Sequence, residues 1–534
     1  MKKIKFLIFS FSMLFMALFS NGQHQCGTTL EDQALMKEAM MYNRKHITAS
    51  QIAAYKNSRA TTYIPLSIHN VADLSGNGHA PKKDIYQMVC DLNGHYANQD
   101  VQFFIHDTIH YILDDHIHND PKNASANIKM SSTAIYKIAQ TVNMYITSGV
   151  GVAINKRASF YSRTGDYVVI RKDMMSPNAS FVEAHELGHF FTLNHPFYGW
   201  EGVDAQSVYP GQNAPTSHYY SGATRYVEYV TRTGPNKNCS YAADGFCDTP
   251  ADYYSVKTTS SCNFTPLTYD PSGATLNPDE ANFMGYYSSC RDSFSMEQRG
   301  AILNDIISRG SNPGWVTQSP ASTIQVSEVG ITNITPSNGA IFQLSGNTTK
   351  LDWSPVAGAT MYLVELYPVT SSGVFTIGGP MYSTIIRNVD EIDLPNNYLT
   401  DLFYNYQWTK FAWKVRPMNN YWTCSDFTPY YHFELGTPTG TQDLEVRRVM
   451  SMDVNPNPVL GNNTTVVVQS TEEIEGAIQL YSIQGQLLAE QPSQLLAVGE
   501  NRIEINLTNV NAGTYMVVVQ TERGALHKKL IIQR

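Results

Sequence analysis

Three histidines and a glutamate stand close together in this sequence, in a spacing that suits a metal ion. His185 and His189 are four residues apart, so a helix places both imidazoles on one face, where they can reach a single ion. His195 follows six residues later and offers a third imidazole, which leaves the fourth tetrahedral position of zinc open for water. Glu186 lies beside these ligands and can take a proton from that water. The spacing predicts a catalytic zinc site with Glu186 as the general base.

The third histidine makes this pattern specific. Short H-E-x-x-H matches occur by chance, but histidine fills only 15 of 534 positions, and a third one at a fixed spacing multiplies the chance expectation by roughly 0.03. Packing or surface histidines on an amphipathic helix are the weaker alternative. Zinc held by neutral imidazoles lowers the pKa of water toward about 7 and polarises a carbonyl, so the predicted reaction is hydrolysis of peptide bonds.

The overall composition is that of a folded protein with several domains. The chain has 534 residues, of which 42% are hydrophobic and 16% are charged, too few charges for a largely disordered chain. The 37 basic and 46 acidic residues give a net charge of -9, which excludes phosphate-driven binding to nucleic acid. We therefore expect protein or peptide substrates and no nucleic-acid partner.

The N-terminal region predicts export. Residues 1–22 have a basic start, an apolar run over 6–19 and a small or polar end, which is typical of a secretory signal peptide rather than a membrane anchor. Residues 23–59 form a predicted pro-segment with helical character over 30–58. No later segment is long and apolar enough to span a bilayer, so we expect an exported protein without a transmembrane helix.

The region that must position the metal residues, 60–310, has the pattern of a mixed α/β domain. Its predicted elements are strands over 63–68, 101–105 and 167–170, and helices over 83–96 and about 133–147. After a linker at 311–322, alternating segments predict a β-sandwich over 323–436 and a further all-β domain over 446–534. The predicted fold class is α+β or α/β for the catalytic domain, followed by two all-β domains.

Export permits disulfide bonds, and four of the seven cysteines fall between residues 239 and 290. They predict two bridges, but the sequence alone leaves three connectivities open. Zinc binding by these thiols is the weaker alternative, because no C-x-x-C pair is present. Cys90, in a predicted helix, and Cys424, in the sandwich, are expected to be buried free thiols.

Several motifs beyond the histidines resemble the pappalysin family of metzincin metallopeptidases. Residues 282–286 are similar to the Met-turn of that class, and further matches follow in the family's order: Glu228, Arg232, 244–252, Cys290, Phe294 and Gln298. The resemblance implies a metzincin-like fold and a secreted zinc endopeptidase. It also implies that Met284 forms the hydrophobic floor below the zinc and that Tyr286 stabilises the oxyanion. Ordinary packing is the alternative role for both side chains.

The same resemblance implies further contacts between residues 239 and 290. It implies two disulfides, Cys239–Cys262 and Cys247–Cys290. It also implies a structural calcium ion, with solvated loop carboxylates as the alternative; the candidate ligands are Asp244, Asp248 and Thr249.

Asp248 has a second implied role, in substrate selection. It resembles the carboxylate that in some pappalysins lines the pocket for the residue after the scissile bond and favours arginine there. The alternative is that Asp248 only fixes its loop or binds calcium. With an arginine preference, the enzyme would remove its own pro-segment at the Ser58–Arg59 bond.

Two residues bear on whether the enzyme is active. Thr192 stands where the family has glycine, and a left-handed turn there would strain a β-branched residue by about 1–3 kcal/mol. Cys26 follows the signal peptide, and its thiolate could fill the open zinc position and keep the enzyme latent, as the resemblance implies. The alternatives are an acidic pro-segment residue as the blocking group, or an unused thiol.

The two C-terminal domains resemble modules of exported proteins. The sandwich is similar to a fibronectin type III-like module, and the end of the chain is similar to the sorting domain of type IX secretion substrates, on the motifs 455–458, 481–485, 513–515 and 528–532. An adhesive β-domain is the alternative for this tail. The resemblance implies contact with the secretion machinery and a secreted, extracellular or outer-membrane surface location. The competing function is a degenerate metallopeptidase that acts in surface binding or adhesion through its sandwich.

Overall fold

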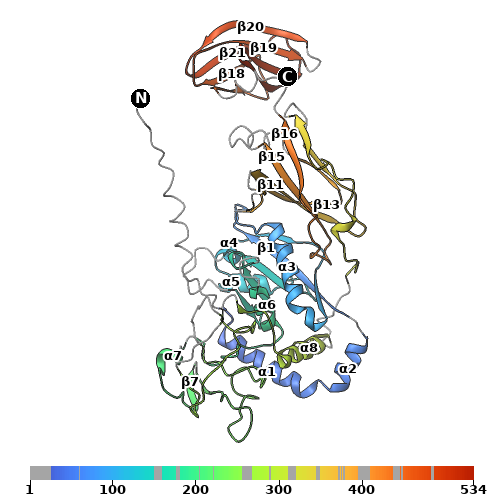
Figure 1. Ribbon diagram of the computed structural model, residues 1–534. Helices are drawn as coiled ribbons and strands as arrows, with labels where there is room; N and C mark the ends of the chain where they lie inside the picture. The colour runs from blue at the N-terminus through green and yellow to red at the C-terminus, as the bar shows by residue number, and fades with distance from the viewer. Residues whose placement is uncertain are drawn as a thin grey trace, which may run out of the picture. The chain divides into compact units, whose positions relative to one another are not determined.

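The computed structural model of the chain is drawn in Figure 1. It describes residues 26–58, 61–148, 159–175, 181–201, 203, 205–220, 222–254, 262, 268–287, 290–310, 320–343, 349–370, 373–374, 376, 379–394, 409–436, 446, 449–482 and 486–533. The predicted signal peptide and residue 59 of the predicted cleavage bond lie outside these residues. The chain divides into two compact units. The first comprises Met1–Glu328, Val356–Leu363 and Arg416–Asp426, and the second comprises Val329–Pro355, Val364–Val415 and Phe427–Arg534.

A six-stranded sheet forms the centre of the first unit. Its strand order is β2-β1-β4-β6-β5, and β2 and β3 pair with successive parts of β1. Neighbouring strands are parallel except β5, which is antiparallel to β6. The strands are Thr62–Ala72 (β1), Val101–Ile105 (β2), His110–Leu113 (β3), Val142–Thr147 (β4), Phe160–Ser162 (β5) and Tyr167–Arg171 (β6). The strands predicted over 63–68, 101–105 and 167–170 are therefore confirmed.

Helices and one hairpin complete this unit, which is the mixed α/β region expected (Figure 1). The helices are Leu30–His46 (α1), Ala49–Ser58 (α2), Lys82–Tyr96 (α3), Asp115–Asn119 (α4), Ala124–Ser131 (α5), Phe181–Phe190 (α6), Ala205–Val208 (α7) and Met296–Gly310 (α8). The hairpin pairs Ser217–Tyr220 (β7) with Ala223–Tyr226 (β8). α3 contacts β2, and α6 contacts α3, β5 and β6, so the sheet supports the helix that carries the H-E-x-x-H motif. The helix predicted over 83–96 is confirmed.

The helix predicted over about 133–147 is wrong. The structure has turns and irregular chain over 133–140, followed by β4 in the middle of the sheet. Gln140 adopts a left-handed φ of 61°, which ends any helix at that point. Every residue of β4 is buried, so its sequence lacks the alternation of a half-exposed strand, and an apolar run of this kind does not distinguish a strand from a helix.

The predicted pro-segment is helical, as expected, and packs on the first unit. Thr29 caps α1, because its side-chain oxygen accepts the N–H of Asp32. Acidic residues lie in the first turn of α1 and basic residues in the last, where their charges interact favourably with the helix dipole. Met36 and Met40 are buried, and α1 contacts α8.

The region 340–436 is all-β. Its strands form one sheet in the order β12-β11-β15-β16-β9, with β13 on β11, and a two-stranded sheet β10-β14. Trp353 and Trp413 are almost fully buried with ring centroids 5.9 Å apart. The strands are Ala340–Gln343 (β9), Thr349–Asp352 (β10), Met361–Thr370 (β11), Gly373–Val374 (β12), Tyr382–Arg387 (β13), Glu391–Leu394 (β14), Lys410–Met418 (β15) and Tyr431–Gly436 (β16).

The end of the chain is a second all-β region with its own core. Two sheets, β17-β18-β21 and β20-β19-β22-β23, enclose apolar side chains such as Val466, Ile478, Val517 and Leu530. Burial alternates along β18, as the period-2 pattern predicted. The strands are Met450–Asn455 (β17), Asn463–Ser470 (β18), Ile474–Ser482 (β19), Leu487–Leu496 (β20), Gly499–Asn506 (β21), Gly513–Thr521 (β22) and Gly524–Ile532 (β23).

The cysteine pairing differs from the prediction. The structure joins Cys239 to Cys247 and Cys262 to Cys290, with Cα atoms 5.0 and 5.6 Å apart, so the predicted pairs Cys239–Cys262 and Cys247–Cys290 are wrong. The loops close locally, because the partners are only 8 and 28 residues apart. Cys90 and Cys424 are also bonded, with Cα atoms 4.9 Å apart within the first unit, so neither is the free thiol that was expected.

Candidate metal centre

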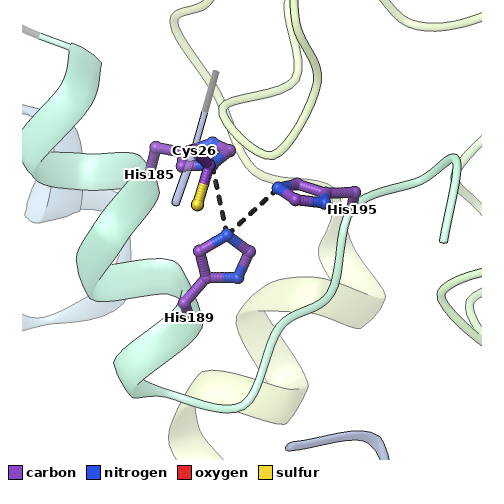
Figure 2. A group of neighbouring side chains, drawn as sticks. All are labelled: Cys26, His185, His189 and His195. Atoms are coloured by element: carbon purple, nitrogen blue, oxygen red, sulfur yellow. Dashed lines mark hydrogen bonds between the residues drawn. The ribbon is translucent and has the colours of Figure 1, made fainter. Parts of the chain in front are cut away.

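Helix α6 and the turn after it carry the three histidines. Nine of the ten residues of α6 are buried, so packing holds the helix on every side. After the helix, Thr192 turns the chain with a φ of 69°, and its N–H donates to the carbonyl of His189 at 2.9 Å. This is the left-handed turn expected to strain a threonine. It leads the chain back so that His195 faces His185 and His189 (Figure 2).

The Nε2 atoms of the three histidines converge on one point (Figure 2). Nε2 of His189 lies 3.2 Å from Nε2 of His185 and 3.2 Å from Nε2 of His195. Two of the rings are oriented by hydrogen bonds from their Nδ1 atoms. Nδ1 of His185 donates to the carbonyl of Phe283, and Nδ1 of His189 donates to the carbonyl of Leu193, each at 2.7 Å. All three rings are buried.

These hydrogen bonds define which nitrogen carries the proton. A carbonyl oxygen only accepts, so Nδ1 of His185 and His189 is protonated, and in a neutral ring Nε2 then holds a lone pair. Burial lowers the pKa of His189 far below its usual value and that of His195 to about 3, so neutral rings are favoured. Lone pairs that point at one another repel, and a cation between them removes the repulsion. The donor set therefore fits a zinc ion held by three neutral imidazoles.

Glu186 is fully buried beside this cluster. Its Oε2 atom lies 3.5 Å from Sγ of Cys26, and its Oε1 atom has no hydrogen-bond partner among the described residues. Burial raises the pKa of Glu186 to about 8. A carboxyl group in this environment can gain and lose a proton near neutral pH.

The N-terminal segment reaches the same place. Sγ of Cys26 and the ligand nitrogens of the three histidines all lie within 4.8 Å of one another (Figure 2). The N–H of Cys26 donates to the hydroxyl of Tyr286 at 2.9 Å, and its thiol donates to Oγ1 of Thr28 at 3.1 Å. Burial and the charge of Glu186 raise the pKa of the thiol above its usual value, so a cation at the histidines would be needed to favour the thiolate.

Tyr286 and Met284 also lie beside the histidines. The ring centroid of Tyr286 is 5.0 Å from that of His195 and 5.9 Å from that of His185. Met284 is fully buried against α6, where a Cβ at Gly188 would lie only 2.4 Å from its sulfur. A side chain at Gly188 would therefore displace Met284 from the helix that carries two of the histidines.

Asp244, Asp248 and Thr249, the predicted calcium ligands, lie outside the group of Cys26 and the three histidines in the described part of the chain. The two carboxylate oxygens of Asp248 accept the hydroxyl of Ser295 and the N–H of Glu297, each at 2.7 Å, at the start of α8. Asp244 accepts the hydroxyl of Thr249 at 3.0 Å, and burial raises its pKa to about 7. The contacts of Asp248 match its alternative role, in which it fixes its loop.

Glu201 is a residue of the site that the sequence did not reveal. Its Oε1 atom lies 3.4 Å from Nδ1 of His195, and its Oε2 atom accepts the N–H of Gly199 at 2.7 Å. A carboxylate behind a ligand histidine fixes the orientation of the ring. The only sequence signal was an acidic residue shortly after the third histidine, which is too common to be specific.

Comparison with known families identifies the end of the chain. The secretion system C-terminal sorting domain matches residues 453–533. The chain therefore carries a type IX sorting tail, and the protein is secreted or lies at the outer-membrane surface. A search of curated proteins found no match. In the described part of the chain, no helix combines the length and the apolar character needed to cross a membrane.

Three solved structures show weak similarity to this chain. Mature mirolysin of Tannerella forsythia in complex with a cleaved peptide is 15% identical, with a TM-score of 0.30, over 48% of this chain and 100% of that chain. A promirolysin mutant of the same organism is 13% identical, with a TM-score of 0.31, over 53% of this chain and 93% of that chain. The chicken CNTN1 FN1-FN3 domains are 11% identical, with a TM-score of 0.15, over 39% and 67%. Similarity at this level does not decide function.

Proposed function

We propose that the protein is a secreted zinc-dependent endopeptidase of the pappalysin type, within the metzincins. The observation that carries this proposal is the convergence of the Nε2 atoms of His185, His189 and His195, two of which are 3.2 Å from the third. Glu186 lies beside this cluster, with Oε2 3.5 Å from Sγ of Cys26, and its Oε1 atom has no hydrogen-bond partner among the described residues. Three neutral nitrogen ligands and an adjacent carboxylate are the groups that metal-assisted hydrolysis requires.

Each residue then has a defined task. When bound, zinc would supply the Lewis acidity that polarises the peptide carbonyl and acidifies water. Glu186 takes the proton of the attacking water and returns it to the leaving amine, and its buried position beside the histidines supports this role. Tyr286, once released from the N–H of Cys26, donates its hydroxyl hydrogen to the oxygen that becomes negative. Met284 supports α6 from below.

The enzyme is made as a zymogen in this proposal. Cys26 would be a fourth zinc ligand, and its contacts with Thr28 and Tyr286 support that position. Hydrogen bonds anchor the segment around it to the rest of the first unit, among them those from Gly27 to Ser159, from Tyr161 to Thr28, from Lys37 to Tyr241 and from Arg44 to Gly245. Loss of residues 23–59 would open the ligand position and free Tyr286.

Two finer features follow from the family resemblance. A calcium ion near Asp244 and Thr249 remains part of the proposal, since a cation would offset the burial that raises the pKa of Asp244. The fibronectin type III-like character of the sandwich is likewise proposed. The proposal does not include a preference for arginine after the scissile bond. Both carboxylate oxygens of Asp248 accept hydrogen bonds at the start of α8 and do not need a substrate arginine as a partner.

Casein cleavage by the secreted, matured protein tests the proposal. We expect one zinc ion per chain in metal analysis, loss of cleavage with a zinc chelator, and recovery after zinc is added. A matured protein that holds one zinc ion, lacks residues 23–59 and cleaves neither casein nor gelatin would instead support the adhesion alternative.

A further inference from the structure

Arg291 is a buried arginine close to the proposed catalytic residues. It is 4% exposed and follows Cys290, which is bonded to Cys262. One guanidinium nitrogen donates to the carbonyl of Gly285 at 2.9 Å, and the guanidinium carbon lies 3.9 Å from the ring centroid of Phe181. These contacts hold a positive charge inside the first unit.

Both contacts place this charge at the metal centre. Gly285 directly precedes Tyr286, whose hydroxyl accepts the N–H of Cys26, and Phe181 is the first residue of α6. Arg291 is therefore fixed between the Met-turn and the helix that carries the histidines. Its backbone position is set by the neighbouring disulfide, so the guanidinium has little freedom to leave this place.

The guanidinium of Arg291 keeps its charge in this position. Burial lowers the pKa of Arg291 itself to about 10, so it remains cationic at neutral pH. A cation is therefore fixed by its hydrogen bond to Gly285, directly before Tyr286, whose hydroxyl contacts Cys26.

A guanidinium group in this position favours a carboxylate, which it can hold through two parallel hydrogen bonds. We propose that Arg291 binds a carboxylate of the substrate next to the scissile bond. The inference rests on the proposed function, because the substrate takes the space of Cys26 only after maturation. The carboxylate belongs to an Asp or Glu side chain or to the free C-terminus of a short peptide. This preference is opposite in charge to the one expected from Asp248.

A purely structural role for Arg291 makes a different prediction. If Arg291 only holds the carbonyl of Gly285, its loss would disturb Tyr286 and slow the cleavage of every peptide by the same factor. A carboxylate-binding role instead slows acidic peptides more than their uncharged counterparts. The ratio between matched peptides separates the two roles, and this ratio does not depend on how much enzyme is folded.

The experiment uses the matured, zinc-loaded enzyme and peptides that differ only in the residue after the scissile bond. We expect kcat/KM for Asp or Glu to exceed that for Asn or Gln by about tenfold or more, in line with a charge-assisted pair. Arg291→Gln should bring this ratio close to one, and Arg291→Lys should keep part of it. Arg299→Gln is the matched control, since Arg299 also donates to a backbone carbonyl, that of Phe294, and should keep the full ratio.

A second arm identifies the source of the carboxylate. The uncharged peptides are assayed with a free C-terminus or a C-terminal amide one to three residues after the scissile bond. Faster cleavage of the free acids assigns the site to the C-terminal carboxylate, and equal rates with a preference for Asp or Glu assign it to a side chain. Equal kcat/KM for all of these peptides, or a preference for arginine, would overturn the inference.

Binding supplies a readout that does not need turnover. Zinc-loaded Glu186→Ala should bind fluorescent acidic peptides more tightly than their amide counterparts in anisotropy measurements, and the added Arg291→Gln change should remove the difference. Binding that ignores the carboxylate overturns the inference even if casein is cleaved. Absence of zinc and of all cleavage would instead reject the proposed function. If Arg291→Gln does not fold, two measurements decide instead: the kcat/KM ratio of acidic to uncharged peptides in the wild-type enzyme, and the ratio of their affinities for Glu186→Ala.

Discussion

The sulfur of Cys26 lies 3.5 Å from a carboxylate oxygen of Glu186, while it also completes a group with the three histidines. The backbone N–H of the same cysteine donates a hydrogen bond to the hydroxyl of Tyr286. One residue thus covers the proposed metal position, the proposed base and the proposed oxyanion donor. All three groups become available together when the N-terminal segment leaves.

Glu186→Ala should abolish hydrolysis but keep the metal. Glu186 handles protons and is not a ligand in the proposal, so we expect a fall in kcat of roughly 100-fold or more with zinc near one per chain. His189→Ala removes the central ligand and should lose both the zinc and the activity. Metal analysis and casein cleavage on the two purified variants check the assignment. An active Glu186→Ala enzyme would exclude its role as the base.

Cys26→Ala should weaken latency. The unprocessed variant loses the proposed fourth ligand while the other anchors of the segment remain, so we expect at least about tenfold more cleavage of a small peptide than for unprocessed wild type. Ser50→Ala, on an exposed position of α2, is the control and should stay latent. Equal latency in Cys26→Ala and wild type would show that another group blocks the site.

Thr192→Gly should stabilise the protein. The left-handed φ of 69° is costly for threonine and free for glycine, and the buried hydroxyl of Thr192 has no hydrogen-bond partner among the described residues. After the lost methyl contact is subtracted, we expect a gain in the free energy of unfolding of about 1 kcal/mol. Thr192→Ala keeps the strain and serves as the control. Urea denaturation of the three proteins measures the difference, and an Ala variant as stable as the Gly variant would mean that strain contributes nothing.

The stability of the first unit should depend on pH through Asp252. Burial raises the pKa of this carboxyl to about 7, and its oxygens accept the hydroxyl of Tyr287 at 3.0 Å and the N–H of Tyr254 at 3.1 Å. A raised folded-state pKa contributes stability that is full below about pH 4, the unfolded value, and is lost as the pH rises through about 7. Both proteins are unfolded with urea in the presence of a chelator. The urea midpoint of the wild type minus that of Asp252→Asn should fall as the pH rises from about 4 to about 7. Asp292→Asn, which changes an exposed carboxylate, should show no such difference.

Non-reducing peptide mapping should recover three linked pairs: Cys90–Cys424, Cys239–Cys247 and Cys262–Cys290. Loss of the longest loop in a Cys90→Ser, Cys424→Ser double variant should lower the free energy of unfolding by roughly 3–5 kcal/mol. Free Cys26 is the internal control, because it should react with a thiol reagent once the protein is unfolded without reduction. Recovery of a peptide that links Cys239 to Cys262 would contradict the pairing seen here.

Local patterns predicted the parts of the fold that depend on near neighbours. The helical spacing of His185 and His189 follows from backbone geometry, so the structure could be anticipated there. The left-handed turn at Thr192 was expected from the resemblance to a family that has glycine at this position, and the structure has this turn. β4 was mistaken for a helix because complete burial removes the alternation that identifies a strand.

Contacts between segments far apart in the chain could not be predicted from the sequence. Whether Cys247 meets Cys239 or Cys290 depends on the path of the loop between them, which no spacing encodes. Glu201 and Arg291 have no motif of their own, and their relevance comes from the direction in which the folded chain points them. The bonds of Asp248 to the start of α8 likewise follow from tertiary packing.

The bond between Cys90 and Cys424 turns most of the chain into a covalent ring. A protease that nicks the backbone anywhere between these residues opens the ring without separating the two parts, whereas a cut before Cys90 or after Cys424 leaves its fragment with no covalent bond to the rest. Removal of the predicted pro-segment and of the sorting tail therefore leaves the ring untouched. A molecule nicked in the linker over 311–322 would run as one species on a non-reducing gel and as two after reduction.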